Sequence, residues 1–256
     1  MCLSIVIDFL WRKEMRLFNV GVLRALQFGS IVIAASALVA CGGSDDSGSS
    51  PGATVKGTTA VGAALANASV SLTCKNGSGS ATSSANGAYS ATFKFDPPCA
   101  ITASSGAVTI HSFAASSGTF NVTPLTDLLL SYLAGQLGTT ESALLAGIST
   151  NASFQSALTN STVIANAVAG VTTLLKNTYG ITLSSGSFLT LAFTPGTNGP
   201  DSDLDALLAA GAITSNGQPA ASLVTAAVAA GAAAPISGGS AGGGGATGGT
   251  GASTTQ

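Results

Sequence analysis

The chain has little charge. Charged residues make up 7% of its 256 residues and aromatic residues 5%, whereas charged residues alone reach about 25% in ordinary globular proteins. After Cys41 there is no arginine, and the only cations are Lys56, Lys75, Lys94 and Lys176, against twice as many acids. Because a nucleic-acid surface needs clustered Lys and Arg to replace counterions, this composition predicts no nucleic-acid partner.

Sequence patterns of common catalytic chemistry are missing as well. His111 is the only histidine, so a zinc site built on two His cannot form. The G-x-S-x-G match at 238–242 and the G-x-G-x-x-G match at 243–248 both fall in the Gly-rich tail. Neither follows a predicted strand or opens a helix, so neither is a triad nucleophile or a Rossmann fingerprint. There is no Walker loop. We therefore predict no catalytic residue and no cofactor. We expect His111 to lie exposed or half-buried on the less apolar face of a strand.

The N-terminal region contains an apolar segment of signal-peptide length. Residues 28–40 are apolar or small, and this segment is shorter than the roughly 20 residues that span a bilayer. Arg16 and Arg24 supply a positive flank, so residues 1–40 are predicted to be a signal peptide. Two acids precede Met15, which makes Met15 the expected start. The alternative is a short buried helix followed by a surface cysteine.

The apolar segment ends at residues 38–41 with Leu-Val-Ala-Cys, and Gly42 follows. This sequence resembles the lipobox of bacterial lipoproteins. The resemblance implies cleavage before Cys41, a diacylglycerol on its thiol and an acylated amino group. Gly42, in place of Asp, implies anchoring in the outer membrane, with the protein facing the periplasm or the exterior. Residues 42–51 are rich in Gly and Ser and are predicted to be a flexible tether.

Two further cysteines predict a disulfide. Cys2 lies before the expected start and Cys41 is the lipid site, which leaves Cys74 and Cys99 as an even pair without CxxC spacing. In an oxidising compartment such a pair forms a bridge. A loop of this length contributes about 3–4 kcal/mol in the chain-entropy model. The alternative is a pair of metal ligands or a reactive thiol.

Residues 52–122 have the pattern of a β-sandwich. Alternating apolar and polar residues occupy 68–74, 89–95, 101–103 and 108–110. Asn76-Gly77 and Asn86-Gly87 separate such runs, which is the strongest short-range hairpin signal, and regular short strands favour a sandwich. Alternate side chains of one strand are expected to form its core face: Tyr89, Ala91, Phe93 and Phe95.

Three sequence stretches of this region resemble the carboxypeptidase regulatory-like or transthyretin-like β-sandwich of bacterial surface proteins. They are residues 55–57, residues 65–72 as a second strand, and residues 82–89 as a turn into an aromatic strand, with Asn86 where the family usually has Asp. The resemblance covers about 70 residues. It implies a domain without catalytic activity that acts as a scaffold or recognition unit.

Residues 123–231 are predicted to be a mainly helical domain. Residues 121–128 resemble a junction in uncharacterised proteobacterial lipoproteins that joins a β-domain to a helical region. Thr123 is a good N-cap and Pro124 suits the first turn, and leucines at helical spacing continue until Gly138 stops the helix. Further helices are expected at 141–147, 162–179, 203–210 and 222–230, and a strand at 187–193. Residues 232–256 cannot form a packed core and are predicted to be disordered. The expected fold is α+β.

One acidic sequence resembles the start of a calcium loop. Asp201, Asp203 and Asp205 alternate along the chain, but the glycine and glutamate of an EF-hand are both replaced by Ala. We therefore regard these residues as weak metal candidates and predict no metal site. Instead, Ser202 or Asp203 is expected to cap the following helix.

These observations favour a lipid-anchored structural or interaction module of the cell envelope, with an envelope protein or a glycan as partner. One alternative is an accessory hydrolase or glycan-processing protein that uses Asp127, Glu141 or the Asp201 cluster as acid and base. Glycosidic chemistry needs two carboxyl groups about 5–10 Å apart in a cleft, so geometry separates the two functions. A calcium-dependent adhesin is the other alternative.

Overall fold

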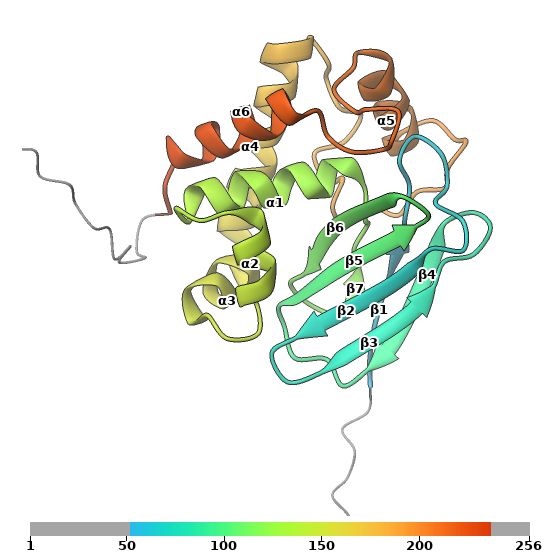
Figure 1. Cartoon of the computed structure of the whole chain (residues 1–256), viewed down its shortest axis with the longest axis vertical. Coiled ribbons are helices and arrows are strands. Elements are labelled where there is room, and N and C mark those ends of the chain that lie inside the picture. Colours follow the sequence, from blue (N-terminus) through green and yellow to red (C-terminus); the bar gives the residue numbers. More distant parts are fainter. Residues whose placement is uncertain (1–51, 237–256) are drawn as a thin grey trace, which may run out of the picture. The chain divides into compact units, whose positions relative to one another are not determined.

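The computed structural model describes residues 52–236 (Figure 1). Within them, seven strands precede six helices along the chain, so the fold is α+β as predicted. The predicted signal peptide, the lipid site at Cys41, the tether at 42–51 and most of the C-terminal tail lie outside the described residues.

The strands form two sheets (Figure 1). The first has the order β4-β1-β7 and the second the order β3-β2-β5-β6. All pairings are antiparallel except that of β1 with β7. The strands are β1 (Ala53–Thr58), β2 (Ser69–Cys74), β3 (Ser78–Thr82), β4 (Ala88–Phe93), β5 (Cys99–Ser105), β6 (Val108–Ala114) and β7 (Gly118–Thr119). Buried residues of both sheets belong to one hydrophobic core.

The two Asn-Gly turns have different outcomes. Asn76-Gly77 joins β2 to β3 in an antiparallel hairpin, which confirms the predicted turn, although no strand was predicted at 78–82. The hairpin predicted at Asn86-Gly87 is wrong, because β3 and β4 lie in different sheets and β4 pairs with β1 instead. This pairing places Ala91 opposite Val55, and both side chains are buried. The turn reverses the chain, but burial against a distant strand selects the partner.

The predicted core face of β4 holds for half of its residues. Tyr89 and Ala91 are buried, and the Tyr89 hydroxyl donates a hydrogen bond to the Phe120 carbonyl oxygen at 2.6 Å. Phe93 and Phe95 are half-buried, and their rings meet edge to face with centroids 5.9 Å apart. Phe95 lies beyond the end of the strand.

Cys74 and Cys99 form a disulfide, as predicted. Cys74 is the last residue of β2 and Cys99 the first of β5, and the two residues oppose each other in the antiparallel register. Their Cα atoms are 4.0 Å apart. The bridge therefore links two neighbouring strands of the four-stranded sheet at one end of the sheet, where β2 ends and β5 begins.

The helices follow the strands, and several begin or end at the predicted residues. They are α1 (Pro124–Gln136), α2 (Glu141–Gly147), α3 (Ala152–Thr159), α4 (Ser161–Tyr179), α5 (Pro200–Ala209) and α6 (Ala221–Ala232). At the start of α1, the Thr126 hydroxyl accepts a hydrogen bond from the Thr123 backbone N–H at 2.9 Å, while the Thr123 side chain accepts from the Thr126 N–H at 3.4 Å. This capping box fixes the beginning of the helix.

Helix α1 is the central helix of the fold. Every residue from 124 to 135 is buried. The sequence predicted burial of one helix face only, the face formed by the leucines at helical spacing, so the buried surface is wider than expected. The helix contacts β6, α2, α4 and α6. Its contact with α6 is backbone to backbone, because a Cβ atom on Gly231 would lie 2.0 Å from the Tyr132 carbonyl oxygen and one on Gly135 would lie 2.2 Å from that of Val228.

The strand predicted at 187–193 is wrong. Residues 187–190 form a turn and residues 191–193 have no regular structure. The buried side chain of Asn121 donates hydrogen bonds to the carbonyl oxygens of Phe188 and Leu191 at 3.0 and 2.7 Å. The Asn121 backbone N–H donates to the Leu189 carbonyl oxygen at 2.7 Å. One asparagine thus satisfies the backbone groups that a strand partner would otherwise satisfy.

No single helix between residues 52 and 236 combines the length and apolar character needed to cross a bilayer. Helices α3 and α4 meet that test only as a pair, with a 74° bend between them.

Candidate functional site

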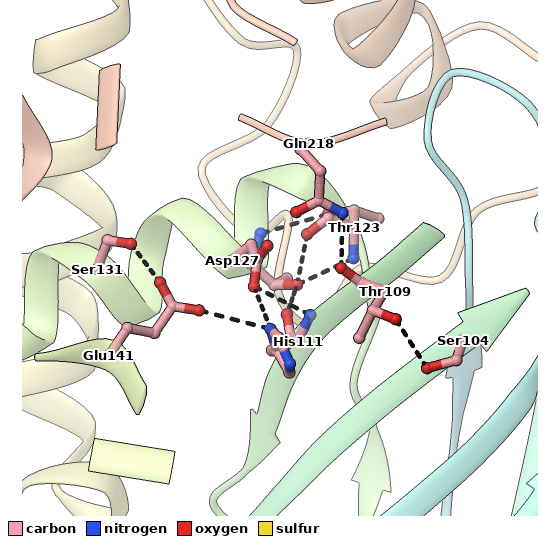
Figure 2. Close-up of polar contacts among 9 residues, drawn as sticks. Ser104, Thr109, His111, Thr123, Asp127, Ser131, Glu141 and Gln218 are labelled. Carbon is pink, nitrogen blue, oxygen red and sulfur yellow. Dashed lines mark hydrogen bonds and ion pairs between the residues drawn. The ribbon is translucent and has the colours of Figure 1, made fainter. Parts of the chain in front are cut away.

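Three titratable side chains from three elements converge on one point. They are His111 of β6, Asp127 in the first turn of α1 and Glu141, the first residue of α2 (Figure 2). His111 Nδ1 lies 2.9 Å from Asp127 Oδ1 and 3.5 Å from Glu141 Oε1. Among the described residues, this is the one group of three or more His, Cys, Asp or Glu side chains whose ligand atoms all lie within 4.8 Å of one another. We call it the His111 cluster.

The cluster forms because α1 packs against β6. The Thr126 hydroxyl donates a hydrogen bond to the His111 carbonyl oxygen at 2.7 Å, which holds the first turn of α1 on the strand. Asp127, the next residue, accepts a hydrogen bond from the His111 backbone N–H at 3.0 Å through the same Oδ1 atom that faces Nδ1. His111 is half-buried, which is one of the two expected outcomes, but its face of the strand is covered by a helix.

The two carboxylates differ in their surroundings. The Asp127 side chain is 8% exposed, whereas those of Glu141 and His111 are 23% and 27% exposed. Glu141 Oε2 accepts a hydrogen bond from the Ser131 hydroxyl, one turn further along α1 than Asp127 (Figure 2). The cluster therefore has one buried carboxylate and one open edge formed by the imidazole and Glu141.

Because a carboxylate only accepts hydrogen bonds, Nδ1 of His111 carries the proton in this contact. Hydrogen bonds to Asp127 and Glu141 raise the pKa of His111 to about 9. Burial raises the pKa of Asp127 to about 6, against the opposing effect of the His111 hydrogen bond. Burial also acts to raise the pKa of Glu141, but the hydrogen bonds from His111 and Ser131 outweigh it, so this pKa lies below its usual value. At neutral pH the cluster holds one positive and two negative charges.

These pKa values predict that stability falls at alkaline pH. The pKa of His111 rises from 6.5 in the unfolded chain to about 9 in the fold, so its stabilisation is complete below pH 6.5 and is lost as the pH approaches 9. Asp127 changes charge below this window. The shift corresponds to about 3 kcal/mol, which solvent screening at the open edge reduces to about 1–2 kcal/mol.

Urea unfolding in metal-free buffer at pH 6.5 and pH 9 measures this loss. His111→Gln is the matched control, because it lacks the imidazole and should lose less stability between the two pH values than the unaltered protein. Equal stability of the unaltered protein at both pH values would contradict the expected role of His111.

Asp201, Asp203 and Asp205 do not converge on a common site. The Asp203 carboxylate accepts hydrogen bonds from the Ser184 backbone N–H, at 3.0 Å to each oxygen, and from the Ser184 hydroxyl at 2.7 Å. Asp201 Oδ2 accepts from the Gly196 N–H at 2.7 Å, and Asp205 is exposed. This geometry gives no support to a calcium loop.

The predicted N-cap of the helix that follows these acids is wrong, although Ser202 does bond to the backbone at the start of that helix. Helix α5 begins at Pro200 with Gly199 as its N-cap, so Ser202 and Asp203 lie inside the first turn. The Ser202 hydroxyl accepts a hydrogen bond from the Gly199 N–H at 2.9 Å. Pro200 at the first helical position extends the helix toward the N-terminus, because its fixed φ suits that position. Asp203 instead anchors the loop at Ser184.

Replacing Asp203 by Ala should therefore destabilise the protein by about 2 kcal/mol, because three hydrogen bonds to a charged acceptor are lost. Asp205→Ala is the matched control, since this exposed acid of the same helix should change the free energy of unfolding by about 0.5 kcal/mol or less. Chemical denaturation measures both values. Equal effects of the two variants would show that the Ser184 contacts contribute nothing.

A separate hollow of about 720 Å³ lies beside α4. Its large apolar lining residues are Ile164 and Val168 of α4 together with Phe120 and Leu189. The remaining lining residues are small or carry hydroxyl groups, and none of them is charged. The His111 cluster is not part of this hollow.

Comparisons with protein-family models, with curated proteins and with solved structures give no match to this chain. The interpretation of the site therefore depends on its geometry. The sequence had already singled out His111, Asp127 and Glu141 individually, but not their convergence. The available signal was a pair of acids in the first turns of two successive helices, after a strand that carries the only histidine.

Proposed function

We propose that the protein is a lipid-anchored module of the bacterial cell envelope that binds or supports a partner and has no catalytic activity of its own. The observation that carries the proposal is the Leu-Val-Ala-Cys sequence at 38–41, followed by a Gly/Ser-rich sequence and then by the described fold. Two or more acyl chains hold a protein stably on a membrane. The Cys74–Cys99 disulfide is consistent with an exported protein.

We further propose that the two sheets are the layers of a transthyretin-like β-sandwich of the carboxypeptidase regulatory-like type. Buried side chains of both sheets support this assignment, because Val55 and Tyr89 of one sheet belong to the same core as Val70 and Ile101 of the other. Such domains serve as scaffolds or recognition units. The partner would be an envelope protein or a glycan.

The internal bonding of the His111 cluster supports a role other than catalysis. Its imidazole and carboxylates bind one another and hold β6, α1 and α2 together. The two carboxylates share one imidazole nitrogen, whereas a glycosidase directs its two carboxyl groups at a sugar between them. The cluster therefore fits a structural joint.

An envelope hydrolase remains a second candidate, because Asp127 and Glu141 do lie together and one edge of the cluster is open to solvent. In that case Glu141 and His111 would be the groups that a substrate reaches. Glycan or ester hydrolysis that disappears in Glu141→Gln, while the fold is retained, would favour this candidate.

Cell fractionation of a Cys41→Ser variant tests the proposal. Without the thiol no diacylglycerol can be attached, so we expect the protein to leave the membrane fraction or to remain as unprocessed precursor. Cys2→Ser is the matched control, because this cysteine precedes the expected start at Met15, and the variant should fractionate normally. Normal processing and membrane retention of Cys41→Ser would refute the lipid anchor.

A further inference from the structure

The three groups of the His111 cluster have the chemistry of a metal site. One imidazole nitrogen and two carboxylate oxygens come from three separate elements and lie within 4.8 Å of one another. Imidazole and carboxylate are both ordinary zinc ligands. We infer that His111 Nδ1, Asp127 and Glu141 bind one zinc ion, which joins β6 to the N-terminal turns of α1 and α2.

The distances between the groups suit tetrahedral zinc. Zinc binds His nitrogen and carboxylate oxygen at about 2.0–2.2 Å, so two ligand atoms of a tetrahedral ion lie about 3.3–3.5 Å apart. His111 Nδ1 is 2.9 Å from Asp127 Oδ1 and 3.5 Å from Glu141 Oε1. An ion therefore needs shifts of only a few tenths of an ångström at these two contacts.

The charge of the cluster also favours a divalent cation. With both carboxylates ionised and the imidazole protonated, the cluster has a net charge of −1. The ion pairs of its carboxylates within residues 52–236 are those with His111, and no lysine contributes. Zinc takes the place of the proton on Nδ1, and that proton passes to solvent. Two carboxylates then balance the two charges of the ion.

Hydrogen bonds from Ser131 and from the backbone of His111 hold the two carboxylates in place. The Ser131 hydroxyl binds Glu141 Oε2, which leaves Oε1 directed at Nδ1, and the His111 N–H binds Asp127 Oδ1. Such bonds orient metal ligands and raise affinity. The partly exposed His111 and Glu141 side chains form an edge where an ion can enter and where water can supply the fourth ligand.

Calcium does not fit the same site. Calcium requires six to eight oxygen ligands, whereas this site offers a nitrogen and two carboxylates. Zinc and calcium are therefore expected to behave differently. The inference depends only on the three side chains and is independent of the proposed lipid anchor, so either can fail without the other.

Nuclear magnetic resonance of the full chain tests the inference, because His111 is the only histidine and a ¹⁵N-histidine label reports on it alone. The protein is prepared in detergent, without a histidine tag and free of metal, and is titrated with zinc chloride. We expect one equivalent of zinc to shift the Nδ1 resonance, and calcium chloride to leave it unchanged.

Variants then assign the carboxylates. Glu141→Gln removes one charged ligand and should weaken zinc binding roughly tenfold or more, whereas Asp205→Asn, the same kind of change at an exposed acid of α5, should leave binding unchanged. An unchanged Nδ1 resonance at millimolar zinc, or a shift confined to Nε2, would overturn the inference. Unchanged zinc affinity in Glu141→Gln would also overturn the inference. If that variant fails to fold, the Nδ1 shift of the unaltered chain on zinc addition is the deciding result.

Discussion

Replacing Cys74 and Cys99 together by alanine should lower the free energy of unfolding by about 3–4 kcal/mol. The bridge closes a loop of 25 residues, and a loop of that length loses about this much stability when the unfolded chain is released from its constraint. The loss should be large for this fold, because β2 and β5 are central strands of the four-stranded sheet and the bridge joins them directly.

Urea unfolding of the double variant against the unaltered protein under non-reducing conditions measures the loss. Reductant provides the matched control, because it should destabilise the unaltered protein by a similar amount and leave the double variant unchanged. A double variant as stable as the oxidised protein would contradict a stabilising bridge.

Replacing Leu129 by Ala should have a comparable effect, a loss of about 3–4 kcal/mol. Leu129 is fully buried in α1, the helix that contacts β6, α2, α4 and α6. Its removal leaves a cavity in a core that can relax only partly, because rigid elements surround the helix. The loss should appear in both thermal and chemical unfolding.

Leu208→Ala is the matched control for this substitution. Leu208 lies on α5 and is 40% exposed, so the same change in side chain should cost well under 1 kcal/mol. Equal losses for the two variants would mean that α1 is not the centre of the core.

The helix ends were the part of the fold most accessible from the sequence. Helix α1 begins at Pro124 and α2 at Glu141, both as predicted, and α4 ends before Gly180, which has a φ of 71°. Each of these ends depends on hydrogen bonds or a backbone conformation within a few residues. Helix α3 was missed although Asn151 caps it, because its 8 residues make only about two turns, too few to show a helical repeat of apolar residues.

Strand partners could not be derived in the same way. A turn sequence specifies a reversal of the chain, but the partner of a strand depends on which distant residues become buried with it. That is why β4 pairs with β1 rather than with β3. Strand β3 itself was missed, because Ser, Gly and Ala at 78–82 give no alternation of apolar and polar side chains.

In the candidate site, too, the sequence indicates the individual residues but not the tertiary contacts between them. Each of His111, Asp127 and Glu141 could be selected from the sequence by its chemistry. Figure 2 shows the three side chains together. Their meeting depends on the packing of α1 against β6 and of α2 against α1. No pattern within one segment contains that contact.

The mass of the N-terminal peptide from native envelopes tests the central claim, lipid anchoring at Cys41, most directly. Between Arg24 and Lys56 the chain has no site for trypsin, so a protein cleaved before Cys41 yields residues 41–56 as one peptide. We predict this peptide with the added mass of a diacylglycerol on the thiol and an acyl chain on the amino group. An unmodified peptide of residues 25–56 would contradict the account.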